Sequence, residues 1–305
     1  MASRLISLAA LVLLAAKAHA AGSIPMVIET TAKAVIVRTA EGKEATRYLR
    51  EKPEGSPSKS GSAAYFHPFT TPKGLVVTDV GPDDHPHHRG VFFAWVNMQG
   101  AVPSDFWGWG ALAPIEDRRI LNRDVKPGPP GAFTAHNEWI ARETVLMSEQ
   151  LNARASQRNG LNVLDLDFQL TPRTNTTLPI GAFSGFCVRT RKSPGIVAHE
   201  PAGVARHPAP KHDKPATGWP DRPWYAYSLD LPEGRGGVAV LNHPGNPPSL
   251  WHNLAPIGML NPCIHAAAPL ELKPDQPLKL RYRVVSFDGD VPTAKLDEMA
   301  REWAN

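Results

Sequence analysis

Apolar and polar residues alternate along two stretches of this 305-residue chain, at positions 164–170 and 278–284. Side chains of a β-strand point alternately to its two faces, so each stretch is predicted to be a strand with one buried and one polar face. Shorter strand-like runs occur at 26–30, 34–39, 75–79, 144–147, 225–231 and 238–242. The pattern therefore predicts many strands.

A helical pattern is clear only near the C-terminus. Thr293 is a suitable N-cap residue, and Leu296, Met299, Ala300 and Trp303 would form one apolar helix face. Elsewhere 31 prolines and 24 glycines interrupt candidate helices. We predict an all-β fold, a large antiparallel β-sandwich with a short C-terminal helix and long loops at 51–63, 123–131 and 196–222.

The first twenty residues have the layout of a secretory signal peptide. Arg4 precedes an apolar run from 5 to 16, which is followed by small residues at Ala18 and Ala20. The apolar run is too short to cross a bilayer, and no later stretch reaches that length. We expect residues 1–20 to be removed, residues 21–305 to form a single β-sandwich domain, and the protein to be periplasmic or secreted.

The net charge is +4, and removing Arg4 and Lys17 with the leader lowers it to +2. This balance gives no reason to expect a nucleic-acid partner or an anionic membrane surface. In an oxidising compartment Cys187 and Cys263 would be able to pair, but the sequence does not decide whether they are close enough.

Candidate chemistry is concentrated in the segment DDHPHHRG at 83–90, directly before the apolar run 91–96. Pro86 disfavours a helix, so the segment is expected to be extended or turned at the entrance of a buried strand. If it is extended, His85 and His87 share one face, while His88 points away and orients a neighbour or caps a turn. Imidazoles are common acids and bases near neutral pH.

Histidines also occur beside aromatic residues or proline in other segments predicted to be loops. His67 follows an aromatic pair, Trp107 and Trp109 flank Gly108, and His243, His252 and Asn261 lie in a proline-rich region. Tryptophan rings suit the C–H faces of a sugar, and polar neighbours suit its hydroxyls. Glu138, two residues after His136, is a further candidate for proton transfer, although a solvent-facing polar stripe explains it equally well.

A metal site is the main competing interpretation of the same histidines. His85 and His87 would form a chelating pair, completed by His67, His243 or His252. No cofactor is otherwise expected, because the sequence contains no phosphate-binding glycine loop, Cys-x-x-Cys or His-Glu-x-x-His, and no nucleophile elbow.

Several segments together resemble the DUF6807 family, whose members are often labelled "methane oxygenase PmoA". They are YFHP at 65–68, DHPHHRG at 84–90, DFWG at 105–108, the stretch 246–252 and LRYRVV at 280–285. The resemblance brings no established activity with it. It implies an exported protein of glycan-degrading bacteria, with a sandwich similar to the galactose-mutarotase-like supersandwich. A methane monooxygenase subunit would be expected to cross a membrane several times, so that label does not fit.

The leading hypothesis is an exported carbohydrate-active enzyme, an epimerase, lyase or hydrolase, that uses histidines as acid and base. His85 and His87 would transfer protons with help from Asp84 or Glu138. The expected ligand contacts are His67, His88, Arg89, Trp107, Trp109, His243, His252 and Asn261. The alternatives are a non-catalytic glycan-binding module and a metal-dependent oxidoreductase or hydrolase.

Overall fold

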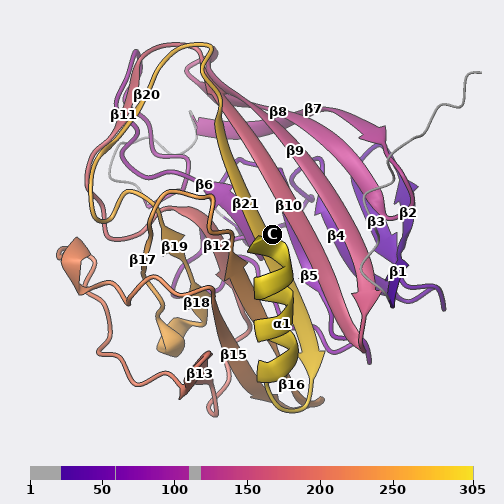
Figure 1. Ribbon diagram of the computed structural model, residues 1–305. Helices are drawn as coiled ribbons and strands as arrows, with labels where there is room; N and C mark the ends of the chain where they lie inside the picture. The colour runs from indigo at the N-terminus through magenta and orange to yellow at the C-terminus, as the bar shows by residue number, and fades with distance from the viewer. Residues whose placement is uncertain (1–21, 59, 110–117, 305) are drawn as a thin grey trace, which may run out of the picture.

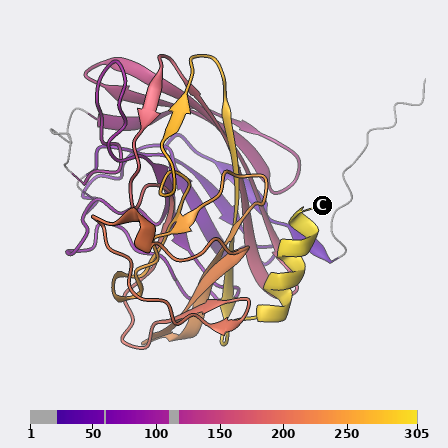
Figure 2. The same ribbon diagram turned by 60° about the vertical axis from the view of Figure 1, so that its left-hand side comes forward.

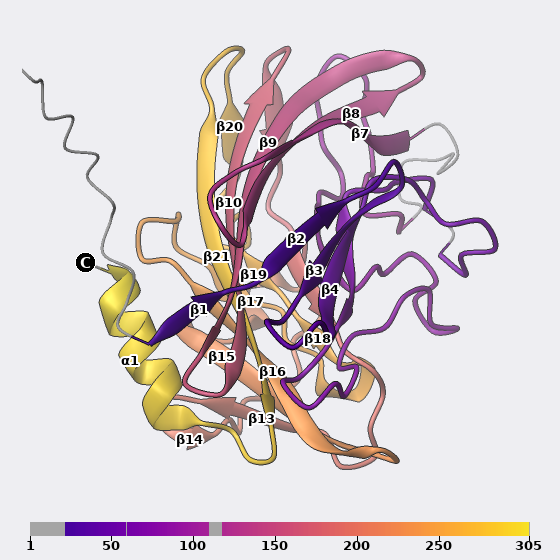
Figure 3. The ribbon, with the colours of Figure 1, turned by 90° about the vertical axis from the view of Figure 1, so that its right-hand side faces the viewer.

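The structure is a computed structural model that describes residues 22–58, 60–109 and 118–304. Two antiparallel sheets form its two layers (Figures 1 and 3). The larger sheet has ten strands in the order β14-β13-β15-β16-β21-β10-β9-β8-β7, and β1 pairs with the end of β9. Its strands are β1 (Ser23–Pro25), β7 (Arg118–Pro127), β8 (Ala132–Ala141), β9 (Thr144–Arg158), β10 (Leu161–Pro172), β13 (Val197–Glu200), β14 (Gly203–Val204), β15 (Trp224–Leu231), β16 (Gly234–Asn242) and β21 (Leu278–Asp288).

The smaller sheet has seven strands in the order β18-β12-β6-β5-β4-β3-β2. They are β2 (Val27–Thr30), β3 (Ala34–Arg38), β4 (Glu44–Leu49), β5 (Tyr65–Phe69), β6 (Val91–Ala94), β12 (Gly185–Arg189) and β18 (Met259–Leu260). Two short ribbons lie beside it, β11 (Thr176–Leu178) with β20 (Leu270–Leu272), and β17 (Leu250–Trp251) with β19 (Pro262–Cys263). Two 3-10 turns, Pro215–Thr217 and Ala255–Ile257, lie in the connecting loops.

The main core lies between the two sheets. Phe186 of β12 stacks on Tyr282 of β21 with ring centres 4.2 Å apart, and Phe93 of β6 packs against Phe168 of β10 at 5.1 Å. Such aromatic pairs bury large apolar areas, which is the dominant stabilising term of the sandwich.

The helix α1 (Thr293–Ala304) covers part of the outer face of the larger sheet (Figures 1 and 2). Leu296 and Met299 are buried there in a second apolar cluster with residues of β10, β15, β16 and β21. Trp224 Nε1 donates a hydrogen bond of 2.8 Å to Asp297. The predicted apolar face of the helix is therefore confirmed, although Thr293 is its first helical residue and the carbonyl of Pro292 accepts the first bonds.

The structure confirms the all-β sandwich with a short C-terminal helix. Three predicted elements differ from the structure. Residues 75–79 make only isolated bridges, and β7 runs through to Pro127, so the 123–131 loop is reduced to the turn between β7 and β8. The predicted loop 196–222 begins with the strand pair β13 and β14, so its loop part starts after Val204. The expected signal peptide, 1–20, lies outside the described residues. Cys187 and Cys263 are buried free thiols, and no helix in the described part of the chain is long and apolar enough to span a membrane.

Candidate functional site

Two consecutive turns shape the histidine segment. The amide of His85 donates to the carbonyl of Pro82 at 2.9 Å, and the amide of His88 donates to the carbonyl of His85 at 3.0 Å. A further bond of 2.9 Å from the Gly81 amide to the His88 carbonyl closes the segment into a compact loop. Two of the eight residues are proline or glycine, which favour turns.

All three imidazoles of this loop come together. Ring centres are 5.7 Å apart for His85 and His87, 4.9 Å for His85 and His88, and 4.7 Å for His87 and His88. The expectation that His88 points away was wrong, because it assumed an extended strand, whereas successive turns rotate the side chains toward one side. His88 is fully buried beneath the other two.

Strand β12 anchors this loop through one buried arginine. Arg189 Nη2 lies 2.8 and 3.1 Å from the two carboxylate oxygens of Asp84. The same carboxylate lies 3.6 Å from His85 Nδ1 and 3.4 Å from Lys192 Nζ. Asp84 therefore links the histidine loop to the smaller sheet and sets the position of His85.

The two tryptophans border the histidines in different ways. Trp107 is fully buried against His88 and Phe92, with ring centres 5.5 and 4.9 Å away. Trp109 is 47% exposed and lies 6.1 Å from His85 and 5.7 Å from His87. Trp109 thus presents an aromatic surface to solvent beside the histidines, and Trp107 belongs to the support beneath them.

The far side of this surface is built from the segment before β12. Phe183 lies 5.5 Å from Trp109 and 5.4 Å from His252, so it joins both to one cluster. Asn261 fixes this segment, because its side chain accepts from the Ser184 amide at 3.1 Å and donates to the Ser184 carbonyl at 3.0 Å. Asn261 is fully buried, so it positions Phe183 from below.

The imidazoles of this cluster are held in the neutral form. Burial lowers the pKa of His87 to about 3, and His85 and Arg89 contribute in the same direction. Burial and the nearby His212 lower the pKa of His252 to about 4. Burial likewise lowers the pKa of His88. Each of these rings therefore offers one hydrogen-bond donor and one acceptor at neutral pH.

His85 and Asp84 form the most polar part of the cluster. Burial lowers the pKa of His85, and the Asp84 carboxylate opposes this shift. Burial works against ionisation of Asp84, but Arg189, His85 and Lys192 outweigh it and lower the pKa of its carboxyl. Asp84 is therefore an anion that favours a proton on His85 Nδ1, which leaves Nε2 of that ring for a ligand.

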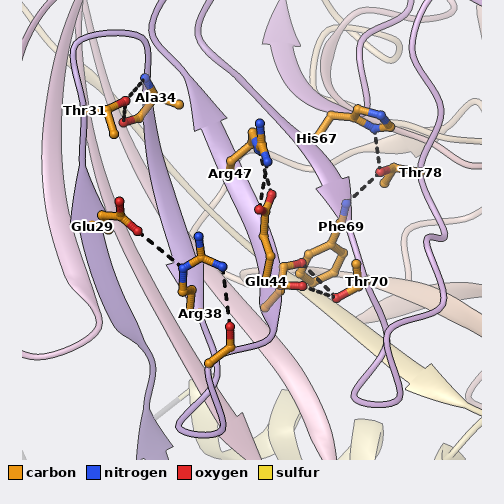
Figure 4. Close-up of polar contacts among 12 residues, drawn as sticks. Glu29, Thr31, Ala34, Arg38, Glu44, Arg47, His67, Phe69, Thr70 and Thr78 are labelled. Carbon is orange, nitrogen blue, oxygen red and sulfur yellow. Dashed lines mark hydrogen bonds and ion pairs between the residues drawn. The ribbon is translucent and has the colours of Figure 1, made fainter.

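Three predicted site residues lie elsewhere. His67 donates to or accepts from Thr78 at 3.0 Å, next to Arg47 and Glu44 on the smaller sheet (Figure 4). His243 contacts Arg281 and Trp303 beside α1. Glu138 pairs with Arg123 on β7. Each of these side chains has a local partner on its own surface.

Arg89 is buried beneath the cluster and does not face solvent. Its guanidinium lies 4.8 Å from the centre of the Phe92 ring, and burial lowers its pKa to about 10. It contributes to the low proton affinity of His87 through its charge.

Arg189, Lys192, Phe183 and His212 were not identified from the sequence. Arg189 gave one usable signal, because it ends the otherwise apolar strand β12, where a buried charge requires a partner. His212 lies in the loop that follows β14, and the centre of its ring is 6.5 Å from that of Trp109. Only the folded chain shows that these residues meet the histidine loop.

Cavities of about 440 and 290 Å³ are lined by other residues, and neither includes His85, His87 or Trp109. Within the described residues, no three histidine, cysteine, aspartate or glutamate side chains are placed as ligands of one metal ion. The cluster is thus an aromatic and imidazole surface supported from below.

A family model matches residues 36–301 of the chain. The chain belongs to DUF6807, a family of unknown function. The resemblance seen in the sequence is therefore confirmed, and the two-turn histidine loop lies within the matched part of this DUF6807 protein.

Comparison with solved structures gives only distant likenesses. The α-galactosidase AgaA of Geobacillus stearothermophilus shows 11% identity and a TM-score of 0.44, covering 86% of this chain and 40% of that one. A Lactobacillus brevis α-galactosidase shows 10% identity and 0.36, covering 86% and 39%, and a polysaccharide lyase shows 10% and 0.30, covering 92% and 35%. This chain spans less than half the length of each, and scores below 0.5 support no conclusion about function. No curated protein matches the sequence.

Proposed function

We propose that this DUF6807 protein binds a carbohydrate on the surface of Trp109 and His85, next to the buried His87, and transfers a proton on the bound sugar. The observation that supports this proposal is the packing of neutral imidazoles around a tryptophan that is 47% exposed. A neutral imidazole donates one hydrogen bond and accepts another, which matches a sugar hydroxyl. The Trp109 ring offers an apolar face for the C–H groups of the sugar.

His85 is the proposed acid and base. Its Nδ1 faces the Asp84 carboxylate at 3.6 Å, in the manner of a carboxylate that orients an imidazole and stabilises its protonated form. The low pKa of His87, about 3, makes that ring a weak base, so we assign it to hydrogen bonding with the ligand. Arg189 holds Asp84 in place as a positioning residue.

The chemistry that fits best is proton abstraction from a sugar carbon next to a carbonyl or carboxylate. Glycoside hydrolysis usually employs two carboxylates on either side of the bond. Within the described residues, Asp84 is the carboxylate in contact with the histidine rings. In an elimination His85 would take the proton from this carbon, the C–H electron pair would form a C=C bond, and the C–O bond to the leaving group on the next carbon would break. In an epimerisation the same removal would be followed by protonation of the opposite face of the carbon by solvent, and His85 would release its proton to solvent.

The test is turnover of a glycan panel by purified protein, followed by the variant His85→Gln. We expect kcat to fall by about 10²- to 10⁴-fold, as for the loss of a general base, with little change in thermal stability. His243→Gln is the matched control, because that histidine lies beside α1. Turnover by His85→Gln equal to that of the wild type would refute the assignment.

A non-catalytic glycan-binding protein is the second candidate. It is favoured by the low pKa values of His87 and His252, because such rings are weak bases but still donate and accept hydrogen bonds. Binding without turnover of any glycan in the panel, retained in His85→Gln and lost in Trp109→Ala, would establish it. Stoichiometric metal in protein purified without chelator would instead favour the metal-dependent alternative.

We further propose that the protein is exported and that residues 21–305 form one domain. The support is the leader-like pattern of residues 1–20. N-terminal sequencing of the protein from the producing cell would show whether the mature chain begins near Ala21.

A further inference from the structure

A separate cavity of about 290 Å³ is lined partly by the residues that follow His252 and partly by the loop that carries His212. It is bounded by β13, the loop that follows β14, and the segment after β17. Its lining residues include Ala198, His207, Ala209, Trp219, Asn253 and Pro256. The volume is near the lower end of the roughly 300–1,000 Å³ typical of ligand pockets, which suits one small unit of a ligand.

Two chain segments join this cavity to the proposed site. His252 packs on Phe183 in the cluster, and the next residue, Asn253, lines the cavity. The loop after β14 presents His212 to Trp109 and presents His207 and Trp219 to the cavity. The two sites are therefore neighbours that share the same supporting segments.

We propose that this cavity is a second carbohydrate subsite, which takes the saccharide unit adjacent to the one bound on Trp109. The inference rests on the proposed function of that surface. Alanine, proline and indole carbons form a small apolar wall for the C–H face of a sugar. A few polar groups at the edge of this wall would fix the orientation of the sugar through hydrogen bonds.

The polar edge is preorganised around Glu200. His207 Nε2 lies 3.1 Å from one carboxylate oxygen, and Arg222 Nε donates to the other at 3.2 Å. The ring of His207 also packs 5.2 Å from Trp219 and 6.2 Å from Tyr225. With Nε2 and the ring plane fixed in this way, Nδ1 of His207 is the nitrogen left for a hydroxyl.

Asn253 supplies a second polar group in the wall. Its Oδ1 accepts the Asn261 amide at 3.0 Å, and because an amide N–H can only donate, this bond fixes which end of the side chain is oxygen. Among the described residues the Nδ2 group is buried and has no hydrogen-bond partner. A buried donor left unpaired is unfavourable, so an acceptor on a bound ligand that reached it would be favourable.

The experiment measures affinity against ligand length on immobilised oligosaccharides of one to six units, both neutral and acidic. For the glycan that binds best, we expect the wild type to gain at least about tenfold in affinity from the monosaccharide to the trisaccharide. Ala209→Trp fills the cavity from an exposed position and should abolish this gain while leaving monosaccharide binding unchanged. Ala202→Trp, at an exposed position outside the cavity lining, is the matched control and should bind like the wild type.

Trp109→Ala separates the two proposals. A loss of monosaccharide binding in Trp109→Ala, with an unchanged length profile in Ala209→Trp, would overturn the subsite and keep the proposed function. Unchanged monosaccharide binding in Trp109→Ala, with loss of the length-dependent gain in Ala209→Trp, would overturn the proposed binding on Trp109 and keep the cavity as an independent site. If no glycan in the panel binds, both proposals fail.

Discussion

At the scale of single residues, the main feature of the site is a group of buried imidazoles that lie close together and remain uncharged. Burial is the largest cause of the low pKa of both His87 and His252, and nearby groups add to it: His85, Arg89 and Arg189 for His87, and His212 for His252. Protonating either ring would place another cation in a desolvated environment, which is costly. The folded chain therefore keeps these rings as neutral donors and acceptors.

We predict that the rings of His87 and His252 remain neutral at pH 5, since their pKa values are about 3 and about 4. Heteronuclear NMR of labelled histidine measures this directly, and protein unfolded in urea provides the control that titrates near 6.5. Because the unfolded chain binds protons below pH 6.5 that the folded chain does not, these residues lower stability as the pH falls. Titration of both rings near 6.5 in the folded protein would contradict the neutral cluster.

At the scale of elements, the histidine loop is held against β5 by close backbone contact. Gly90 has φ +58°, and a Cβ added there would lie 2.3 Å from the Phe66 carbonyl oxygen and 3.1 Å from His67 Cβ. The Gly90 carbonyl also accepts the Arg189 amide of β12 at 2.7 Å. One glycine thus lets the loop join two strands of the smaller sheet at its base.

We predict that Gly90→Ala lowers the free energy of unfolding by about 2–5 kcal/mol, combining left-handed strain with a backbone clash. Gly289→Ala is the matched control, because Gly289 has φ +72° but nothing within 4 Å of an added Cβ. Strain alone should cost the control about 1–2 kcal/mol. Urea unfolding followed by tryptophan fluorescence measures both, and equal losses would show that the close approach at Gly90 does not matter.

At the scale of the whole molecule, a polar network crosses the apolar core between the sheets. Tyr48 of β4 donates to Asn137 of β8 at 2.8 Å, and Asn137 and Trp139 both donate to Glu149 of β9 at 2.8 Å. Burial raises the pKa of Glu149 to about 7, although these donors oppose the shift. The carboxyl is therefore protonated in the folded chain over a range where it is ionised in the unfolded chain.

We predict that this network makes the wild type lose stability as the pH rises from about 4.5 to about 7. The unfolded chain releases the Glu149 proton first, and the difference between pKa values of 4.5 and about 7 corresponds to at most about 3 kcal/mol. The variant Glu149→Gln does not titrate, but its single side-chain oxygen replaces two, so one of the donors Asn137 and Trp139 loses its acceptor. The variant should therefore be less stable than the wild type at pH 4.5, and its stability should not fall between pH 4.5 and 7 for this reason. Chemical unfolding at several pH values measures the free energy of unfolding of both proteins. If this free energy changed with pH identically in the wild type and the variant, the role of Glu149 would be refuted.

The alternating pattern of the strands fixed which faces are buried, because the period of two is a local property of the backbone. The sequence alone therefore predicted β10, β21 and the apolar face of α1, and it selected the histidine segment as the candidate site. The directions in which the side chains of His85, His87 and His88 point do not follow from the alternation of a strand. They depend on two successive turns, so the assumption of an extended strand misplaced His88.

Only the tertiary structure decided which residues meet at the site. Arg189 lies 105 residues after Asp84, yet the pairing of β12 with β6 in the smaller sheet brings the two side chains into contact. In the sequence His67 and His243 lie beside aromatic residues or proline, as His252 does, but β5 places His67 against Thr78, and the segment after β16 places His243 against Arg281. Sheet order controls such contacts, and it results from the packing of the whole core, so no stretch of the sequence encodes it by itself.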